Sequence, residues 1–128
     1  FLVLGLGDSA SRAVAQLVKQ IPNEQGLFRT INTDFAIADI DIHQLERFDV
    51  PHKLQLDPKE NLEQNQLTEQ SENKIRTLLN GYDLVFLVVG LGDDISTGSA
   101  PIVARIAKDM GNFLLNTLKN KGKGNFRL

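Results

Sequence analysis

Four short segments of the 128-residue chain are predicted as β-strands. Phe1–Leu4 and Leu84–Val89 are unbroken apolar runs that end at glycines, which is typical of strands buried on both faces of a parallel sheet. Leu27–Asp34 and Val50–Leu56 are predicted as the second and third strands in chain order. Because Pro51 has no N–H to donate to a ladder, the third strand is expected near an edge of the sheet.

The segments between these runs carry apolar residues at three- and four-residue spacing, which predicts helices. The first helix has its apolar stripe at residues 13–21. Ser9 or Ser11 is expected as its N-cap, because a hydroxyl oxygen can accept a hydrogen bond from the free N–H groups of a first turn. Phe35–Ile40 is predicted as a turn or short helix, and Ile42–Phe48 fits either a helix or a strand.

Two further helices are predicted in the second half of the chain. Leu67–Leu79 has a thin apolar stripe and is expected on the surface, after a polar loop at Asp57–Gln66. From Ile102 to Leu118 the helical spacing continues through Gly111, so one long helix is expected, with Pro101 near its first position. A break at Gly111 is the alternative.

Strands that alternate with helices predict a three-layer, Rossmann-like α/β domain with a mostly parallel sheet. At 128 residues the whole chain, 1–128, is expected to form a single domain. Its two glycine-rich turns follow the first and fourth strands, so both are expected side by side at the carboxyl edge of the sheet. Open α/β folds bind their ligands at that edge.

Composition excludes several classes of protein. The 41% hydrophobic and 23% charged content is ordinary for a soluble globular protein, and the net charge of −2 gives no general attraction to nucleic acid or membrane. No apolar run reaches the roughly 18 residues of a membrane helix. The absence of cysteine excludes disulfides, zinc–cysteine sites and a thiol nucleophile, and it fits a cytoplasmic protein.

The two ends of the chain suggest a piece of a longer protein. The chain begins at Phe1 without methionine, already within a strand-like run. The basic residues after Leu118 are expected to form a solvated helix end and loop, since a nucleic-acid arm would interleave more aromatic residues. Phe126–Leu128 alternatively reads as the start of another strand.

The two glycine-rich turns have the composition of phosphate-binding loops. Gly5–Ser11 and Gly90–Gly98 each lie between a strand and a helix N-terminus, where backbone N–H groups and the helix dipole attract anions. Gly5–Ala10 also matches the dinucleotide fingerprint G-x-G-x-x-A, with Asp34 to take a ribose hydroxyl, so an NAD-type domain is a competing hypothesis. No P-loop motif is present.

Carboxylates within these loops oppose phosphate binding. Asp8, Asp93 and Asp94 would each repel a phosphate unless the side chain points away or holds a bridging Mg²⁺ ion. Arg12 is placed to offset one of these charges. His43 has no partner at metal-ligand spacing, and no catalytic group is predicted in the chain.

Taken together, these motifs resemble those of the FtsZ/tubulin superfamily, and within it FtsZ. The similarity runs over nearly the whole chain and is most specific in the order of its motifs. They are Val3–Gly7 followed by Ser11, Ile31–Asp34 (Ile-Asn-Thr-Asp, the second-strand signature), Lys53–Leu56, Asp83–Gly92, and Thr97–Ala104 with its Thr-Gly-Ser-Ala-Pro. The resemblance implies the N-terminal nucleotide-binding domain of the family, truncated, with GTP or GDP as the ligand.

The departures from the family fall on the site. Glycines of the family's first loop are Asp8, Ser9 and Ala10 here, and Arg12 replaces an asparagine. The family signature at this position is Gly-Gly-Gly-Thr-Gly-Thr-Gly. In this chain, Gly92–Gly98 retains only the first glycine and the final Thr-Gly pair of that signature. The resemblance implies nucleotide contacts from Gly7, Asp8, Ser9, Ala10, Ser11, Arg12 and Asn32, and from Gly92, Ser96, Thr97, Gly98 and Ser99.

Four hypotheses for function follow. The first is a divergent FtsZ-like protein of the bacterial division machinery, with degenerate phosphate loops, weak or altered nucleotide binding and no hydrolysis by this chain alone. The second is an authentic GTP-binding FtsZ relative seen in its N-terminal half, with hydrolysis completed by a catalytic loop outside the chain. The third is the NAD-type domain, and the fourth is a ligand-free interaction module. A second copy or an FtsZ-family protein is the expected partner.

Overall fold

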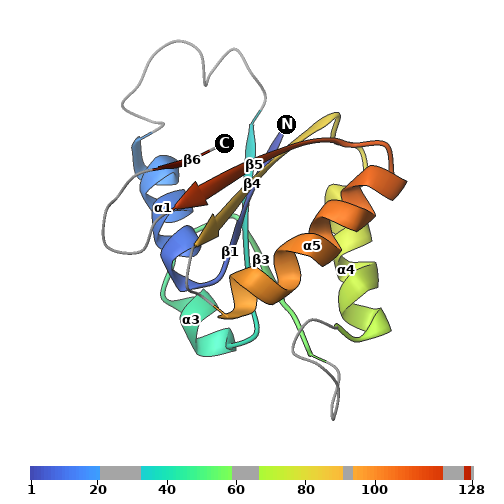
Figure 1. Ribbon diagram of the computed structural model, residues 1–128. Helices are drawn as coiled ribbons and strands as arrows, with labels where there is room; N and C mark the ends of the chain where they lie inside the picture. Colours follow the sequence, from blue (N-terminus) through green and yellow to red (C-terminus); the bar gives the residue numbers. More distant parts are fainter. Residues whose placement is uncertain (21–32, 59–66, 91–93, 120–125, 128) are drawn as a thin grey trace.

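The computed structural model describes residues 1–20, 33–58, 67–90, 94–119 and 126–127, and these form one layered α/β arrangement (Figure 1). Six strands form one sheet in the order β3-β2-β1-β4-β5-β6. The strands β1 to β5 are parallel, and β6 pairs antiparallel with β5. Their bounds are Leu2–Leu6 (β1), Asp34–Asp39 (β2), His52–Gln55 (β3), Leu84–Gly90 (β4), Phe113–Lys119 (β5) and Phe126–Arg127 (β6). The predicted mostly parallel α/β fold is confirmed.

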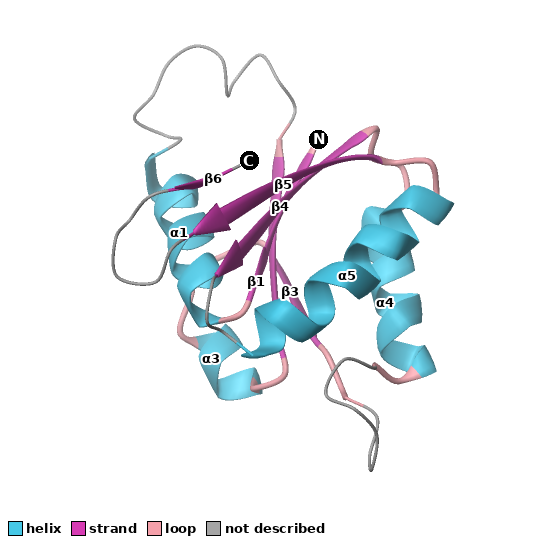
Figure 2. Cartoon of the chain, in the orientation of Figure 1, coloured by secondary structure: helices cyan, strands magenta, loops and turns pink. Residues whose placement is uncertain are grey.

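Helices cover both faces of the sheet, as Figure 2 shows. They are α1 (Asp8–Gln20), α3 (Ile42–Glu46), α4 (Glu69–Leu79) and α5 (Asp94–Asp109). Alternate residues of β1 enter two separate cores: Val3 packs with α1 and α3, and Leu4 packs with α4 and α5. This double burial explains why the first and fourth strands are continuous apolar runs instead of alternating ones.

Helix α1 packs closely on β1 because β1 carries a glycine at the contact. A Cβ built on Gly5 would lie 2.9 Å from Cγ2 of Val14 and 3.0 Å from the carbonyl oxygen of Ala10. The first distance is shorter than real side chains show and the second is very tight, so a side chain at this position would force α1 or β1 to shift. Ala10 and Val14 are fully buried at this contact.

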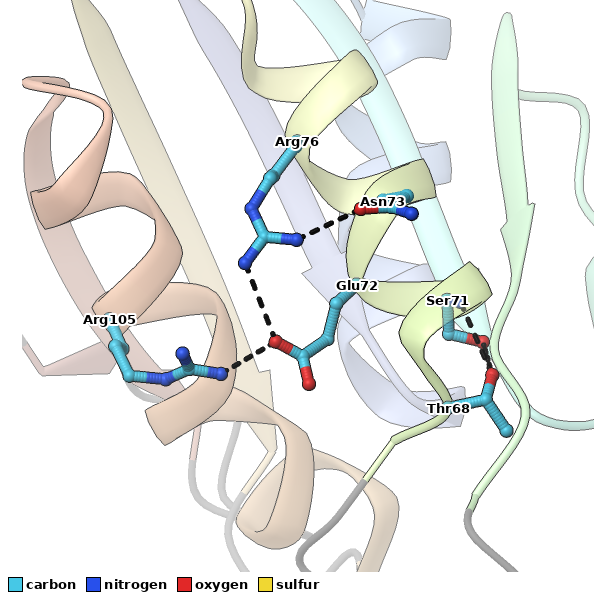
Figure 3. A network of polar contacts seen from close by, with 6 residues as sticks. All are labelled: Thr68, Ser71, Glu72, Asn73, Arg76 and Arg105. Carbon is cyan, nitrogen blue, oxygen red and sulfur yellow. Dashed lines mark hydrogen bonds and ion pairs between the residues drawn. The ribbon is translucent and has the colours of Figure 1, made fainter.

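On the opposite face, polar contacts join α4 to α5 (Figure 3). The carboxylate of Glu72 accepts a hydrogen bond of 2.7 Å from Arg105 of α5 and lies 3.7 Å from Arg76 of its own helix. At the start of α4, Thr68 is the N-cap and accepts from the N–H of Ser71. The predicted surface helix is therefore confirmed, and it begins two residues later than expected.

The second strand was predicted too early in the chain. Residues 27–32 of the predicted strand lie outside the described residues, and Thr33 precedes β2. The prediction of a turn or short helix at Phe35–Ile40 is wrong, because Asp34–Asp39 forms β2. Its four apolar residues, Phe-Ala-Ile-Ala, are all buried between the two helical layers. The third strand is at the edge of the sheet, as expected from Pro51.

The predicted long helix from Ile102 to Leu118 is also wrong. Helix α5 ends at Asp109, Gly111 takes a positive φ of 79°, and β5 follows. Asn112 fixes this turn, because its side-chain amide donates to the carbonyl oxygens of Leu79 and Tyr82. The alternative, a break at Gly111, is therefore correct. The alternative strand at Phe126 is confirmed as well, while residues 120–125 and 128 lie outside the described residues.

At the amino edge of the sheet, a hydrogen bond joins the start of β2 to the segment before β4. The hydroxyl of Tyr82 donates to the carboxylate of Asp34 over 2.6 Å. Burial, with the hydrogen bond and the negative charge of Asp34, raises the pKa of Tyr82 from 10.0 to about 12. Each of these effects favours the neutral phenol in the folded chain.

We predict that Gly5→Ala lowers the free energy of unfolding by about 1–3 kcal/mol, because the new methyl group forces α1 away from β1. Urea denaturation measures this change. Gly111→Asn is the matched control, since a Cβ at Gly111 meets no atom within 4 Å and asparagine tolerates a positive φ. The control is expected to lose about 1 kcal/mol or less. A variant Gly5→Ala as stable as the parent would contradict the close packing.

We also predict that Tyr82 ionises near pH 12 in the folded chain, against 10.0 for a free side chain. Its contribution to stability is complete below pH 10 and is lost as the pH rises through the folded-state pKa. Phenolate absorbance reports on Tyr82 alone, because the chain has one tyrosine and no tryptophan. Asp34→Asn should lower the midpoint. An ordinary midpoint in the folded parent chain would contradict the hydrogen bond.

Candidate functional site

The sheet changes direction of growth between β1 and β4. From β1 the chain adds β2 and β3 on one side, and it then returns to add β4 and β5 on the other. The two central strands pair in parallel, with Leu6 opposite Val89, so Gly7 and Gly90 follow at the same edge. The strands β1 and β4, after which the two loops were predicted, therefore end at the same carboxyl edge. In open α/β sheets this reversal leaves a crevice suited to ligands.

Helices α1 and α5 both begin at this edge, on opposite faces of the sheet (Figure 1). A single residue, Gly7, joins β1 to α1; it has a φ of +85° and its N–H donates to the carbonyl of Ala38. Helix α1 thus begins at Asp8. The predicted N-caps Ser9 and Ser11 are wrong, because both lie inside the helix. The first-turn N–H groups of α1 point along the helix axis toward the crevice, with the positive end of the helix dipole.

Ser11 has an unusual environment for a hydroxyl group. It lies in the first turns of α1, is 1% exposed, and its Oγ has no hydrogen-bond partner among the described residues. A buried hydroxyl without a partner costs about 1–3 kcal/mol. A bound ligand that accepted a hydrogen bond from this hydroxyl would remove that cost. Ser11 is also one of the residues that the sequence singled out.

Asp8 and Arg12 form an ion pair on the exposed side of α1. The two charged groups are 3.4 Å apart, one helical turn from each other, and about half of each side chain is exposed. Arg12 therefore offsets the charge of Asp8, as the sequence predicted. Asp8 is in the first turn, so its carboxylate also interacts favourably with the helix dipole and competes there with any other anion.

Two carboxylates at the end of β2 were missed in the sequence. Asp39, the last residue of β2, is 7% exposed, and its Oδ1 accepts from the N–H of Asp41. Asp41 is the N-cap of α3 and accepts from the N–H of His43 at 2.9 Å. Asp39-Ile40-Asp41 thus occupies the place that the resemblance gave to Asn-Thr-Asp. The displaced strand prediction concealed this, although an aspartate directly after a buried apolar run was a visible signal.

Asp34 lies at the opposite edge of the sheet from Gly7. It begins β2 and pairs with Leu2, whereas the NAD-type hypothesis needs it at the carboxyl end. A ribose hydroxyl bound near Gly7 would be a full strand length away. Asp34 therefore has no part in the site, and the NAD-type hypothesis loses the residue on which it depended. Asn32, which precedes it, lies outside the described residues.

The second loop is shorter than expected, because α5 begins at Asp94. Gly92 and Asp93 lie outside the described residues, and Ser96 and Thr97 belong to the first turn of the helix. Gly98 and Ser99 follow in the next turn of α5, and both are buried. Pro101 was predicted near the first helical position; it instead lies within α5, where it leaves the carbonyl of Thr97 without a helical N–H. Apolar residues after Pro101 hold the helix on the sheet.

Among the residues that the structure describes, no three histidine or acidic side chains converge as a metal site requires. Within the same residues, no helix is both long and apolar enough to span a bilayer.

Comparison of the sequence finds relatives over most of the chain. It is 36% identical over 118 residues to the cell division protein FtsZ of Rickettsia typhi and 31% identical over 121 residues to that of Coxiella burnetii. Each match covers 85% of this chain, but 24% and 28% of the relative. The chain thus spans about a quarter of the length of these curated relatives. No family model matches it.

Comparison of the structure gives the same result for the fold. A mutant FtsZ from M. jannaschii matches with a TM-score of 0.74 and 23% identity, over 91% of this chain and 36% of the FtsZ chain. An empty FtsZ dimer from the same organism matches with a TM-score of 0.66 and 21% identity, over 91% of this chain and 35% of the other. In sequence and in fold the chain therefore resembles the N-terminal nucleotide-binding domain of FtsZ, a protein of the FtsZ/tubulin superfamily.

Proposed function

We propose that this chain is the nucleotide-binding unit of a divergent FtsZ-like protein, and that it takes the phosphates of GTP or GDP in the crevice between β1 and β4. The observation that carries the proposal is the buried, unpartnered hydroxyl of Ser11 beside the start of α1. Ser11 belongs to α1, which begins one residue after β1, the strand on whose two sides the sheet grows. A phosphate oxygen bound there would accept from this hydroxyl and from N–H groups at the start of α1.

The altered loops make the binding weaker or differently selective. Glycines let a backbone approach phosphate closely, and this chain instead has Asp8, Ser9 and Ala10 in the first loop. The carboxylate of Asp8 sits at the same helix end as the proposed phosphate. Arg12 offsets part of that charge. Asp39 adds a second carboxylate at the edge, where a ribose hydroxyl could donate to it.

Hydrolysis is not assigned to this chain by itself. Among the described residues at the carboxyl edge, the side chains are suited to binding, and none forms a nucleophile–base pair. In the intact protein, GTP hydrolysis and assembly would require further elements or a second copy. A role in bacterial cell division, in the cytoplasm and as a homo-oligomer or with an FtsZ-family partner, is proposed on the basis of the curated relatives.

We predict that GDP or GTP raises the midpoint of thermal unfolding of the chain, while NAD does not. A ligand at 100 times its Kd adds about 2.7 kcal/mol, which shifts the midpoint by several degrees in a domain of this size. Scanning calorimetry with each nucleotide, with and without Mg²⁺, measures the shift. No shift with any nucleotide at millimolar concentration would overturn the proposal and favour a ligand-free interaction module.

Ser11→Ala should have opposite effects on the free and the bound chain. Without ligand, removal of an unpartnered buried hydroxyl leaves the stability unchanged or raises it slightly. With ligand, loss of a hydrogen bond to a charged phosphate weakens binding by about tenfold or more. Thr77→Ala, on the exposed side of α4, is the matched control and should leave nucleotide affinity unchanged. Equal affinity of Ser11→Ala and parent would exclude the hydroxyl from the site.

Asp8→Asn should strengthen nucleotide binding by several-fold. A carboxylate about 5 Å from a phosphate repels it by roughly 3 kcal/mol at an effective dielectric of 20, and exposure to solvent reduces this to about 1 kcal/mol. Asp109→Asn, at the far end of α5, removes the same single negative charge as Asp8→Asn and serves as the control. Titration calorimetry with GDP measures the affinity. Weaker binding by Asp8→Asn only in Mg²⁺ would instead assign the carboxylate to a bridging metal.

A further inference from the structure

Strand β3 presents one side without a partner among the described residues. It is the terminal strand of the sheet and pairs only with β2 on its inner side. Pro51, His52 and Lys53 are exposed. An edge strand of this kind offers backbone N–H and C=O groups that a further extended segment can pair with.

The direction of the outward backbone groups of β3 follows from one hydrogen bond. The N–H of Leu56, just after β3, donates to the carbonyl of Asp39 at 2.9 Å, so it faces β2. Because backbone groups alternate along a strand, Lys53 and Gln55 direct their N–H and C=O outward. The side chain of Lys74 agrees with this, since its ammonium donates to the outward carbonyl of Gln55 at 3.3 Å.

An open groove of about 640 Å³ runs between β3 and α4. Its lining contains cationic and apolar side chains but no carboxylate. The lining residues are Pro51, His52, Lys53, Leu54, Gln70, Asn73, Lys74, Thr77 and Leu78. The chain as a whole carries a net charge of −2, so this groove is locally basic on an acidic protein. Charge complementarity therefore favours an acidic occupant.

We propose that this groove binds an extended acidic peptide of a partner protein, which pairs with the outer side of β3. A peptide N–H would replace the ammonium of Lys74 as the donor to the carbonyl of Gln55. The ammonium of Lys74 would then pair with a carboxylate of the peptide. Alternate apolar side chains of the peptide would pack on Leu54 and Leu78, which are partly buried against the core. The proposal is independent of the nucleotide site, which lies at a different edge of the sheet.

A second copy of the chain fits this groove less well than an acidic peptide. Pairing of β3 with β3 would bring Lys53 and Lys74 of one chain to the same residues of the other. Like charges directly opposite one another destabilise a strand pair. Self-association through β3 is therefore an outcome that would overturn the proposal.

The test uses a fluorescein-labelled, eight-residue peptide of alternating glutamate and valine, with fluorescence anisotropy as the readout. The double variant Lys53→Glu/Lys74→Glu should bind about tenfold more weakly, since each reversal replaces an attraction with a repulsion. Lys19→Glu/Lys108→Glu, with exposed lysines on α1 and α5, carries the same net charge and should bind as the parent does. Circular dichroism confirms that both variants unfold at the parent midpoint.

Two further peptides separate strand pairing from simple charge attraction. A peptide with the same side chains but N-methyl groups on alternate residues cannot donate to Gln55, and it should bind at least tenfold more weakly. A lysine–valine peptide should not bind. The amide resonances of Lys53 and Gln55 should shift on titration with the acidic peptide. Equal binding of the N-methyl peptide, absence of binding by the acidic peptide, or dimers that Lys53→Glu/Lys74→Glu disrupts would overturn the proposal.

Discussion

The close contact between helix α1 and strand β1 at Gly5 determines what the carboxyl edge of the sheet can do. A side chain at this position would strike Val14 and the carbonyl of Ala10, so only glycine lets the two backbones come so near. The single residue Gly7 then turns the chain from strand to helix. The first turn of α1 is thereby held directly above the reversal between β1 and β4. Any ligand at this edge meets a rigid helix end instead of a long loop.

The sequence predicted the layered fold and the position of the candidate site, because both depend on strong local signals. The apolar run before Gly90 and the glycines after β1 fix two parallel neighbours and the edge at which they end. Prediction from the sequence failed where one segment fits both a helical and a strand pattern. Phe113–Lys119 keeps the helical spacing of α5, yet the positive φ of Gly111 and the bonds from Asn112 turn the chain into a strand. Such long-range contacts leave no mark in a local pattern.

The placement of β2 shows how one register error spreads to the chemistry of a site. With the second strand assigned to residues 27–34, Asp34 was expected at the carboxyl edge. With β2 at Asp34–Asp39, the same residue bonds to Tyr82 at the amino edge, and Asp39 takes the place near Gly7. The aspartate at the carboxyl end of β2 is therefore Asp39 and not Asp34. The unpartnered state of Ser11 could not be predicted either, since it depends on what surrounds the hydroxyl in three dimensions.

Charge is distributed unevenly between the carboxyl edge and the outer side of β3. Asp8, Asp39 and Asp41 gather near the end of β1 and β2, while Lys53 and Lys74 line the groove beside β3. Within a Debye length of about 8 Å at physiological salt, each surface attracts ligands whose charge is opposite to that of the surface. A phosphate at the carboxyl edge must therefore be held by N–H and hydroxyl donors against an unfavourable field. An acidic segment at β3 is drawn by the field and positioned by backbone hydrogen bonds. The two proposed binding surfaces would thus select their ligands by different physical means.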